Sequence, residues 1–336
     1  MYGAFIGDIV GSKYEFHNIK TKKFPLFSQG CDYTDDTIMT VAVAKAILLS
    51  RQDKLEKNEN RKGFQEFLIE SMRDFGKRYP NPTGAYGSSF ANWLRQHNPK
   101  PYGSYGNGSA MRVSPCGLVA VTLEEALALA RAAACVTHNH PEGVKGAEAV
   151  SAAVFLAKCG KGKEEIKQYI SEHYYNLDFT LDEIRDSYEF DGSCQGSVPQ
   201  AIVAFLESVS FEDAIRNVIS IGGDCDTNGA ITGSIAWVYY AIQTGTYSGW
   251  VYNEFDSAMS AIKAKAITYI PQEFVDIADE FHEICRKRAG VYGRVGICSS
   301  ILNSTETKKY LTDPEKATTR QAQNPSCTVT PKSEKR

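Results

Sequence analysis

Apolar residues recur at helical spacing along most of this 336-residue chain, whereas the alternation typical of β-strands is nearly absent. Phe64, Phe67, Leu68, Met72 and Phe75, for example, form one stripe. Because helices bury such stripes against one another, the sequence predicts an all-α fold, a compact many-helix bundle. We expect helices over residues 3–12, 38–49, 64–79, 123–136, 142–158, 164–174, 200–209, 211–220, 230–242 and 271–288.

Polar and glycine-rich stretches separate these helices. Residues 13–32 and 50–63 are predicted as loops, and residues 193–199 as a lead-in to the next helix. Gly3, Gly7 and Gly11 recur every four residues, so one face of the first helix is small enough for another helix or a ligand to approach closely. We expect one domain over residues 1–295 and a polar, disordered tail over residues 303–336.

The composition excludes several classes of protein. A hydrophobic content of 43% allows a sizeable core, and a formal net charge of −3 argues against a strongly basic nucleic-acid binder. The nine cysteines form no C-x-x-C pair, which favours free thiols in a reducing compartment. No basic leader segment and no apolar run of about 18 residues is present. We therefore expect a cytoplasmic protein, monomeric, with no membrane or nucleic-acid partner.

Asp224 and Asp226 form the most unusual feature of the sequence. They follow Gly222-Gly223 and precede an apolar segment, so they are predicted to lie on a loop that opens a buried helix. A carboxylate at such a junction costs free energy unless something pairs with it. A cation is the obvious partner.

A second acidic cluster precedes the helix over residues 38–49. Carboxylate and hydroxyl oxygens are hard ligands, which suit Mg²⁺, Mn²⁺ or Ca²⁺ better than zinc. The negative charge exceeds what one divalent ion requires, so two ions that share a carboxylate and activate a water for hydrolysis would fit. Helix capping is the alternative for either cluster alone. The predicted metal ligands are Thr34, Asp35, Asp36, Asp224, Asp226 and Thr227.

Five segments of the sequence form a further pattern: Gly3 to Gly11 with Gly7-Asp8, Thr34-Asp35-Asp36-Thr37, Gly106-Asn107-Gly108-Ser109-Ala110-Met111-Arg112, Thr137-His138-Asn139-His140-Pro141-Glu142-Gly143 and Gly222-Gly223-Asp224-Cys225-Asp226-Thr227. In these segments the sequence resembles the ADP-ribosylglycohydrolase family, whose members release ADP-ribose from modified arginine, serine or dinitrogenase reductase. The resemblance covers roughly residues 1–290 and implies an orthogonal all-α bundle with a binuclear Mg²⁺ or Mn²⁺ site. By that resemblance the six predicted ligands match the metal ligands of the family, and Glu15 matches an acid on a mobile loop near the scissile ribose.

A substrate site is expected beside the metal ligands. Gly106, Asn107, Gly108 and Ser109 offer backbone N–H groups without bulky side chains, as a diphosphate or ribose requires, although such a turn alone is weak evidence. His138 matches a substrate-contacting histidine of the family, and its alternative role is a helix-end cap. The aromatic residues before this loop either stack on adenine or belong to the core: Phe90, Trp93, Tyr102 and Tyr105.

The resemblance implies hydrolysis of the bond between the distal ribose of ADP-ribose and an acceptor. Arginine-linked ADP-ribose is the expected substrate, although the sequence does not decide between arginine, serine and another acceptor. Asp36 or Asp226 would act as general base on the attacking water, and the sequence does not choose between them. Cys225 departs from the small residue that the family often has there. Two alternatives stay open: a silent, crystallin-like or ADP-ribose-binding relative, which the complete ligand set argues against, and a binuclear-metal hydrolase of another nucleotide glycoside or a phosphate ester.

Overall fold

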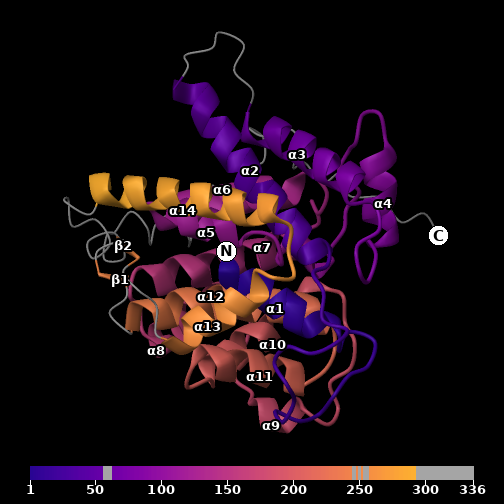
Figure 1. Ribbon diagram of the computed structural model, residues 1–336, viewed down its shortest axis with the longest axis vertical. Helices are drawn as coiled ribbons and strands as arrows, with labels where there is room; N and C mark the ends of the chain where they lie inside the picture. Colours follow the sequence, from indigo (N-terminus) through magenta and orange to yellow (C-terminus); the bar gives the residue numbers. More distant parts are fainter. Residues whose placement is uncertain (56–62, 244–246, 249–250, 253–256, 293–336) are drawn as a thin grey trace.

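The computed structural model describes residues 1–55, 63–243, 247–248, 251–252 and 257–292. It confirms the all-α fold, with a single pair of two-residue antiparallel strands among the described residues (Figure 1). The elements in chain order are α1 (Tyr2–Ser12), α2 (Asp35–Leu55), α3 (Phe64–Arg78), α4 (Ser88–Arg95), η1 (Asn107–Ser109), α5 (Ser114–Val119), α6 (Leu123–Cys135), α7 (Pro141–Lys158), α8 (Lys163–His173), α9 (Leu181–Ile184), α10 (Cys194–Leu206), α11 (Phe211–Ser220), α12 (Cys225–Gln243), β1 (Tyr247–Ser248), β2 (Val251–Tyr252), α13 (Ser257–Ala266) and α14 (Gln272–Tyr292).

The glycines of α1 pack directly against the backbone of α12. A Cβ atom added to Gly7 would lie 1.8 Å from the carbonyl oxygen of Gly229, and one added to Gly3 would lie 2.1 Å from that of Gly233. At the end of α1, a Cβ on Gly11 would lie 2.6 Å from the Cα of Asp226. The four-residue glycine spacing therefore serves helix contact, and this seam brings α1 and the start of α12 together.

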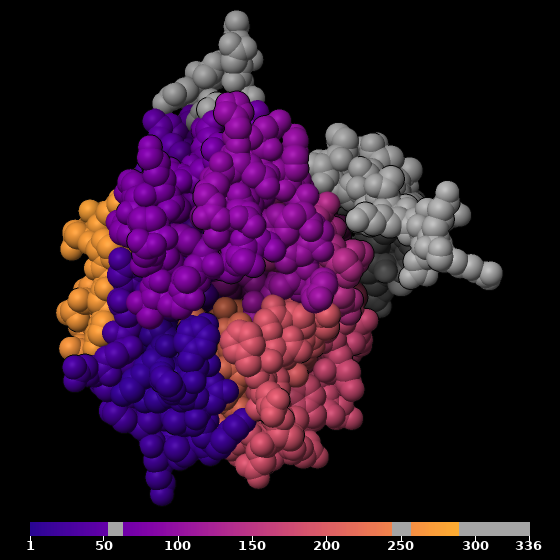
Figure 2. Space-filling model, turned by 90° about the vertical axis from the view of Figure 1, so that its right-hand side faces the viewer, coloured from indigo at the N-terminus to yellow at the C-terminus, as the bar shows by residue number. Residues whose placement is uncertain are grey.

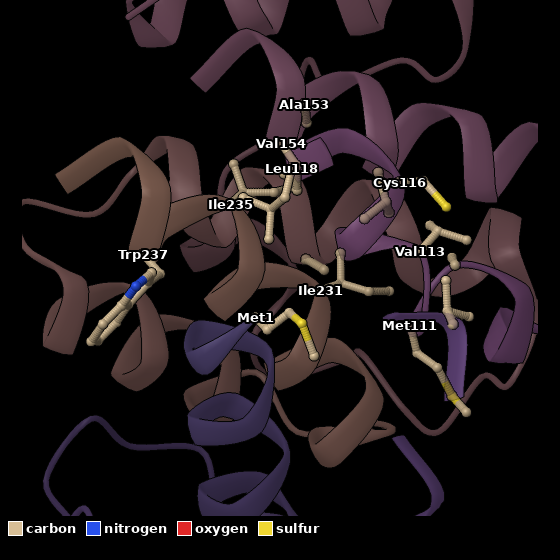
Figure 3. Packing of buried hydrophobic residues seen from close by; sticks show 14 of the residues in the cluster. Met1, Met111, Val113, Cys116, Leu118, Ala153, Val154, Ile231, Ile235 and Trp237 are labelled. Atoms are coloured by element: carbon tan, nitrogen blue, oxygen red, sulfur yellow. The ribbon is translucent and has the colours of Figure 1, made fainter. Parts of the chain in front are cut away.

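Helix α12 runs through the centre of the core. Its side chains are buried from Cys225 to Val238, and α1, α2, α7, α10 and α11 pack around it. Figure 3 shows Ile231 and Ile235 of α12 between Met1 and the residues of α5, among them Leu118. Because α12 is enclosed on all sides, its first residues are held rigidly where they enter the core.

Several predicted boundaries were wrong. The helix expected over 38–49 continues to Leu55, so the first residues of the predicted 50–63 loop are helical. Arg51, on this extra turn, pairs with Glu125 at 3.5 Å, a contact that sequence pattern cannot show. Most of the predicted lead-in over 193–199 is also helical. Ser193 caps α10, the helix begins at Cys194, and Pro199 lies inside it. The helix expected over 230–242 begins earlier, at Cys225, so Asp226 lies in a helix and not on the predicted loop. Helices α4, α5 and α13 were not predicted.

Other expectations meet the structure in part. No helix among the described residues is long and apolar enough to cross a membrane. Cys31, Cys116, Cys194, Cys225 and Cys285 carry free thiols, as expected, whereas Cys135 departs from that expectation because it is disulfide-bonded. The predicted tail over residues 303–336 lies outside the described residues, and the single domain over 1–295 stays a prediction.

Candidate metal and substrate site

Asp8 of α1 fixes the start of α2. Its fully buried carboxylate accepts hydrogen bonds from the backbone N–H of Thr34 at 3.0 Å, from the hydroxyl of Thr34 at 2.8 Å and from the backbone N–H of Thr37 at 3.0 Å. These bonds satisfy N–H groups that a helix start leaves without partners. Sequence reasoning quoted Asp8 but gave it no role, although an acid inside an otherwise apolar helix was a usable signal.

The two predicted acidic clusters meet in the fold. Thr227 donates its hydroxyl to Asp36 Oδ2 at 3.2 Å, which joins the start of α12 to the start of α2. Gly222 and Gly223 have φ values of +73° and +78°, a left-handed conformation that favours glycine. This turn directs Asp224 into the site, and α12 begins one residue later, so Asp226 lies in its first turn.

Glu15 comes close to both aspartates of the second cluster. One oxygen from each of Glu15, Asp224 and Asp226 lies within 4.8 Å of the others. On its far side, Glu15 Oε2 lies 2.8 Å from where a Cβ on Gly84 would stand, and Gly84 has a φ of +78°. Gly84 thus leaves room for the Glu15 carboxylate, a role that sequence reasoning missed.

Asn18 fastens the loop that carries Glu15 to the turn before α12. Its amide N donates to the carbonyl of Gly223 at 2.9 Å, and its amide O accepts from the N–H of Gly223 at 2.8 Å. Its amide also lies 3.7 Å from Cys225 Sγ, so this thiol contacts the loop. Two opposed hydrogen bonds to one residue fix both the position and the orientation of the loop.

Burial and neighbouring negative charge raise the pKa values of five acids of the site. Burial, followed by the negative charge of Asp226, raises the pKa of Asp8 to about 7 and that of Glu15 to about 8. The same two causes raise the pKa values of Asp35, Asp36 and Asp224 well above the usual range of an aspartate. Such shifts are typical of acidic groups gathered in a functional site.

Ion pairs within the described residues do not balance this charge. No lysine or arginine in the described part of the chain forms an ion pair with these acids. Asp36 Oδ1, Asp226 Oδ1 and Glu15 Oε2 are also buried without a hydrogen-bond partner. Buried carboxylate oxygens without partners cost free energy, so the donor set fits hard divalent cations.

The predicted substrate loop adjoins these carboxylates. The Asn107 side chain donates to Asp224 Oδ2 at 2.8 Å, which links the two parts of the site. Ser109, in contrast, is fully buried and donates its hydroxyl to the carbonyl of Gly143 at 2.6 Å, so this hydroxyl is used inside the protein. Gly106 and Gly108 lie against the ring of His138, whose Nε2 would be 3.5 and 3.3 Å from a Cβ at those positions.

The aromatic residues divide between core and surface. Phe90 and Trp93 are buried in α4 with stacked rings 5.6 Å apart, which supports the core alternative for this pair. Tyr102 is half-buried, with its ring 5.7 Å from that of His138. Tyr105 is 52% exposed and is therefore the one of the four that lies open to a ligand. Figure 2 shows indigo, purple and salmon parts of the chain meeting on one face, which brings distant segments together there.

Comparison with known proteins agrees with this geometry. The family model described as ADP-ribosylglycohydrolase matches residues 1–244. The human ADP-ribosylhydrolase ARH3 is 27% identical, over 71% of this chain and 84% of that protein. The ADP-ribosyl-[dinitrogen reductase] glycohydrolase of Rhodospirillum rubrum is 25% identical, over 74% of this chain and 86% of that protein.

A solved structure shares the fold. A chain of an ADP-ribosylglycohydrolase-related protein complex superposes with a TM-score of 0.53 at 21% identity, over 80% of this chain and 95% of that one. With the family match over residues 1–244, this likeness completes the assignment. The chain belongs to the ADP-ribosylglycohydrolase family and is a hydrolase of ADP-ribose glycosidic bonds.

Proposed function

We propose that this enzyme requires divalent metal ions and releases ADP-ribose from arginine side chains of modified proteins. The carrying observation is the group of buried carboxylates that form no ion pair with any described residue and that keep oxygen atoms free of hydrogen bonds. Two ions, Mg²⁺ or Mn²⁺, are the proposed cofactors. When bound, such ions lower the pKa of water and stabilise negative charge that develops during hydrolysis.

The proposed ligands come from the starts of two helices. Each element supplies carboxylate or hydroxyl oxygens at a position that the backbone fixes, α2 through the bonds of Asp8 and α12 through the glycine seam. This rigidity keeps the ligands in place before any ion arrives. The residues are Thr34, Asp35 and Asp36 from the first helix start and Asp224, Asp226 and Thr227 from the second.

Asp36 and Asp226 are the candidates for general base. Each keeps one buried oxygen without a hydrogen-bond partner, which leaves that oxygen able to accept a proton or to orient a water. Glu15 lies beside Asp226, where its carboxylate can face the ribose that loses its acceptor. The glycines from Gly106 to Gly108 would admit the ribose or diphosphate to the same place.

An arginine acceptor fits the charge of the site. Six acids gather there: Asp8, Glu15, Asp35, Asp36, Asp224 and Asp226. Two divalent ions leave this group negative if all six are ionised, so a positively charged guanidinium would be attracted and a neutral serine O-glycoside would not. This difference in charge between the two acceptors predicts faster release of ADP-ribose from arginine than from serine.

The test uses one modified protein in two forms, ADP-ribosylated on arginine or on serine. We expect Mg²⁺-dependent release of ADP-ribose, faster from arginine, and loss of release in Asp35→Ala and Asp224→Ala with an unchanged helical spectrum. Release that persists in excess chelator would refute the metal requirement, and faster release from serine would refute the acceptor. Binding of ADP-ribose without any hydrolysis would identify a catalytically silent relative. Hydrolysis of a phosphate ester alone would identify a binuclear-metal hydrolase that acts on phosphate esters.

A further inference from the structure

Thr137 stands between a buried arginine and a buried histidine. Arg112, 1% exposed, donates from Nη2 to the Thr137 hydroxyl oxygen at 2.7 Å and to the carbonyl of Ala133 at 3.0 Å. The same hydroxyl lies 2.6 Å from Nδ1 of His138. Burial lowers the pKa of Arg112 to about 10, so its guanidinium stays charged at neutral pH. The metal ligands do not belong to this chain of contacts.

The protons along this chain can be assigned from the distances. The Thr137 hydroxyl accepts from Arg112, which has only donors, and its single proton can go either to His138 Nδ1 at 2.6 Å or to the carbonyl of Ala134 at 3.5 Å. The shorter contact is a strong hydrogen bond and the longer one is at the limit of bonding. The hydroxyl therefore donates to Nδ1, which must be unprotonated to accept.

The other nitrogen of His138 faces the substrate loop. Nε2 lies against Gly106 and Gly108, and no residue of the described ranges forms a hydrogen bond with it. The titratable neighbours of the ring are Arg112 and Tyr102. Burial first, and the charge of Arg112 second, lower the pKa of His138 well below its usual value, so the ring stays neutral.

We propose that Arg112 and Thr137 are positioning residues that hold His138 as the neutral Nε2–H tautomer. His138 then donates one hydrogen bond from Nε2 to an acceptor oxygen of bound ADP-ribose at the Gly106–Gly108 loop, and it transfers no proton during the reaction. The ligand rests on the proposed substrate site, whereas the tautomer rests only on the contacts of Thr137. The two parts can therefore fail separately.

The tautomer is tested by ¹⁵N NMR of the full chain labelled on histidine, with His138→Gln to assign the signal. We expect the Nε2–H form throughout pH 5.5 to 8.0. In Thr137→Val we expect a mixture of tautomers, and in Thr137→Ser the wild-type form. An Nδ1–H ring, or a ring that titrates in this range, would overturn the proposal whatever the activity of the enzyme.

Binding tests the consequence for the ligand. We expect Thr137→Val to weaken ADP-ribose binding about tenfold by calorimetry, as for one lost hydrogen bond, and to raise KM with little change in kcat. Thr137→Ser should restore binding. Thr232→Val is the matched control, because its buried hydroxyl donates at 2.7 Å to the carbonyl of Ala201, away from the site. Equal affinity for ADP-ribose in Thr137→Val and wild type would refute the donor role. The same loss of affinity in Thr232→Val as in Thr137→Val would also refute it.

Discussion

Replacing Gly7 with alanine should separate the two central helices. The added Cβ would lie 1.8 Å from the carbonyl oxygen of Gly229 and 2.2 Å from its carbonyl carbon, and both are backbone atoms that no rotamer change can move. Because contacts below 3.0 Å are essentially never seen for real Cβ atoms, α1 and α12 must move apart by more than 1 Å at this level. A gap of that size loses a quarter to a half of the dispersion energy of each contact across the seam.

The free energy lost when α1 and α12 move apart in Gly7→Ala exceeds what alanine gains as a helix former. Alanine favours a helix by about 1 kcal/mol relative to glycine, whereas overpacking of a core costs about 1 to 3 kcal/mol and a seam of this length is at the upper end. We expect a net loss of about 2 kcal/mol or more in the free energy of unfolding. For a domain of this size that lowers Tm by about 4 °C or more. Thermal unfolding followed by circular dichroism measures it.

Gly87→Ala is the matched control for Gly7→Ala. A Cβ at Gly87 would meet nothing within 4 Å, and the residue stands at the start of α4 with a φ of −51°, which alanine adopts easily. Its Tm should stay within about 1 °C of wild type, as for other surface substitutions. A Gly7→Ala protein that is as stable as this control would refute the close-packed seam.

Three further predictions concern the site and the tail. Without metal, burial and the charge of Asp226 raise the pKa of Asp8 to about 7 and that of Glu15 to about 8 in the folded state, above the ordinary pKa values of 3.8 and 4.5. The folded state therefore retains protons that the unfolded chain has released. In chelator, the free energy of unfolding should therefore fall as pH rises from about 4 to 8, and Mg²⁺ should abolish this fall. A Tm that rises with pH in chelator would contradict this prediction. Asn18→Ala should lower kcat by about tenfold or more while Tm changes little, because the loop that carries Glu15 loses both hydrogen bonds to Gly223. Unchanged turnover would show that Asn18 does not position this loop for catalysis. Removal of the residues after Asn303 should leave hydrolysis unchanged, and a truncated protein without turnover would refute the tail prediction.

The periodic parts of the fold were predictable, and the parts that depend on distant partners were not. Residues 211–220 and 64–78 form helices where the stripes place them, since one face of each is buried and the pattern records it. Residues 193–199 were predicted to precede the helix over 200–209, yet α10 starts at Cys194, five residues before Pro199. A proline in the sequence shows that one backbone N–H is missing, which disfavours a helix. Only the structure shows that α10 accommodates this proline in its interior.

The candidate site shows the same limit. Two acidic helix starts indicated a cation, because carboxylates beside buried helices need a partner wherever they lie. The spacing could not say whether the α1 glycines face a helix or a ligand, because that depends on which segment packs opposite. Gly84 carried no signal at all, since its importance comes only from the carboxylate of Glu15, far away in the sequence.

The close contact between α1 and α12 also determines the geometry of the proposed ion site. Asp8 and Asp226 belong to the two helices that touch there, and Gly11 meets the backbone of Asp226 itself. The distance between the acids is thus set by how closely two backbones approach. Mg²⁺ prefers oxygen atoms at about 2.0 to 2.1 Å and Ca²⁺ at about 2.3 to 2.6 Å, so half an ångström separates one ion's site from the other's. Selection for a different metal would act on small residues buried in the seam, some of them two helical turns from any ligand.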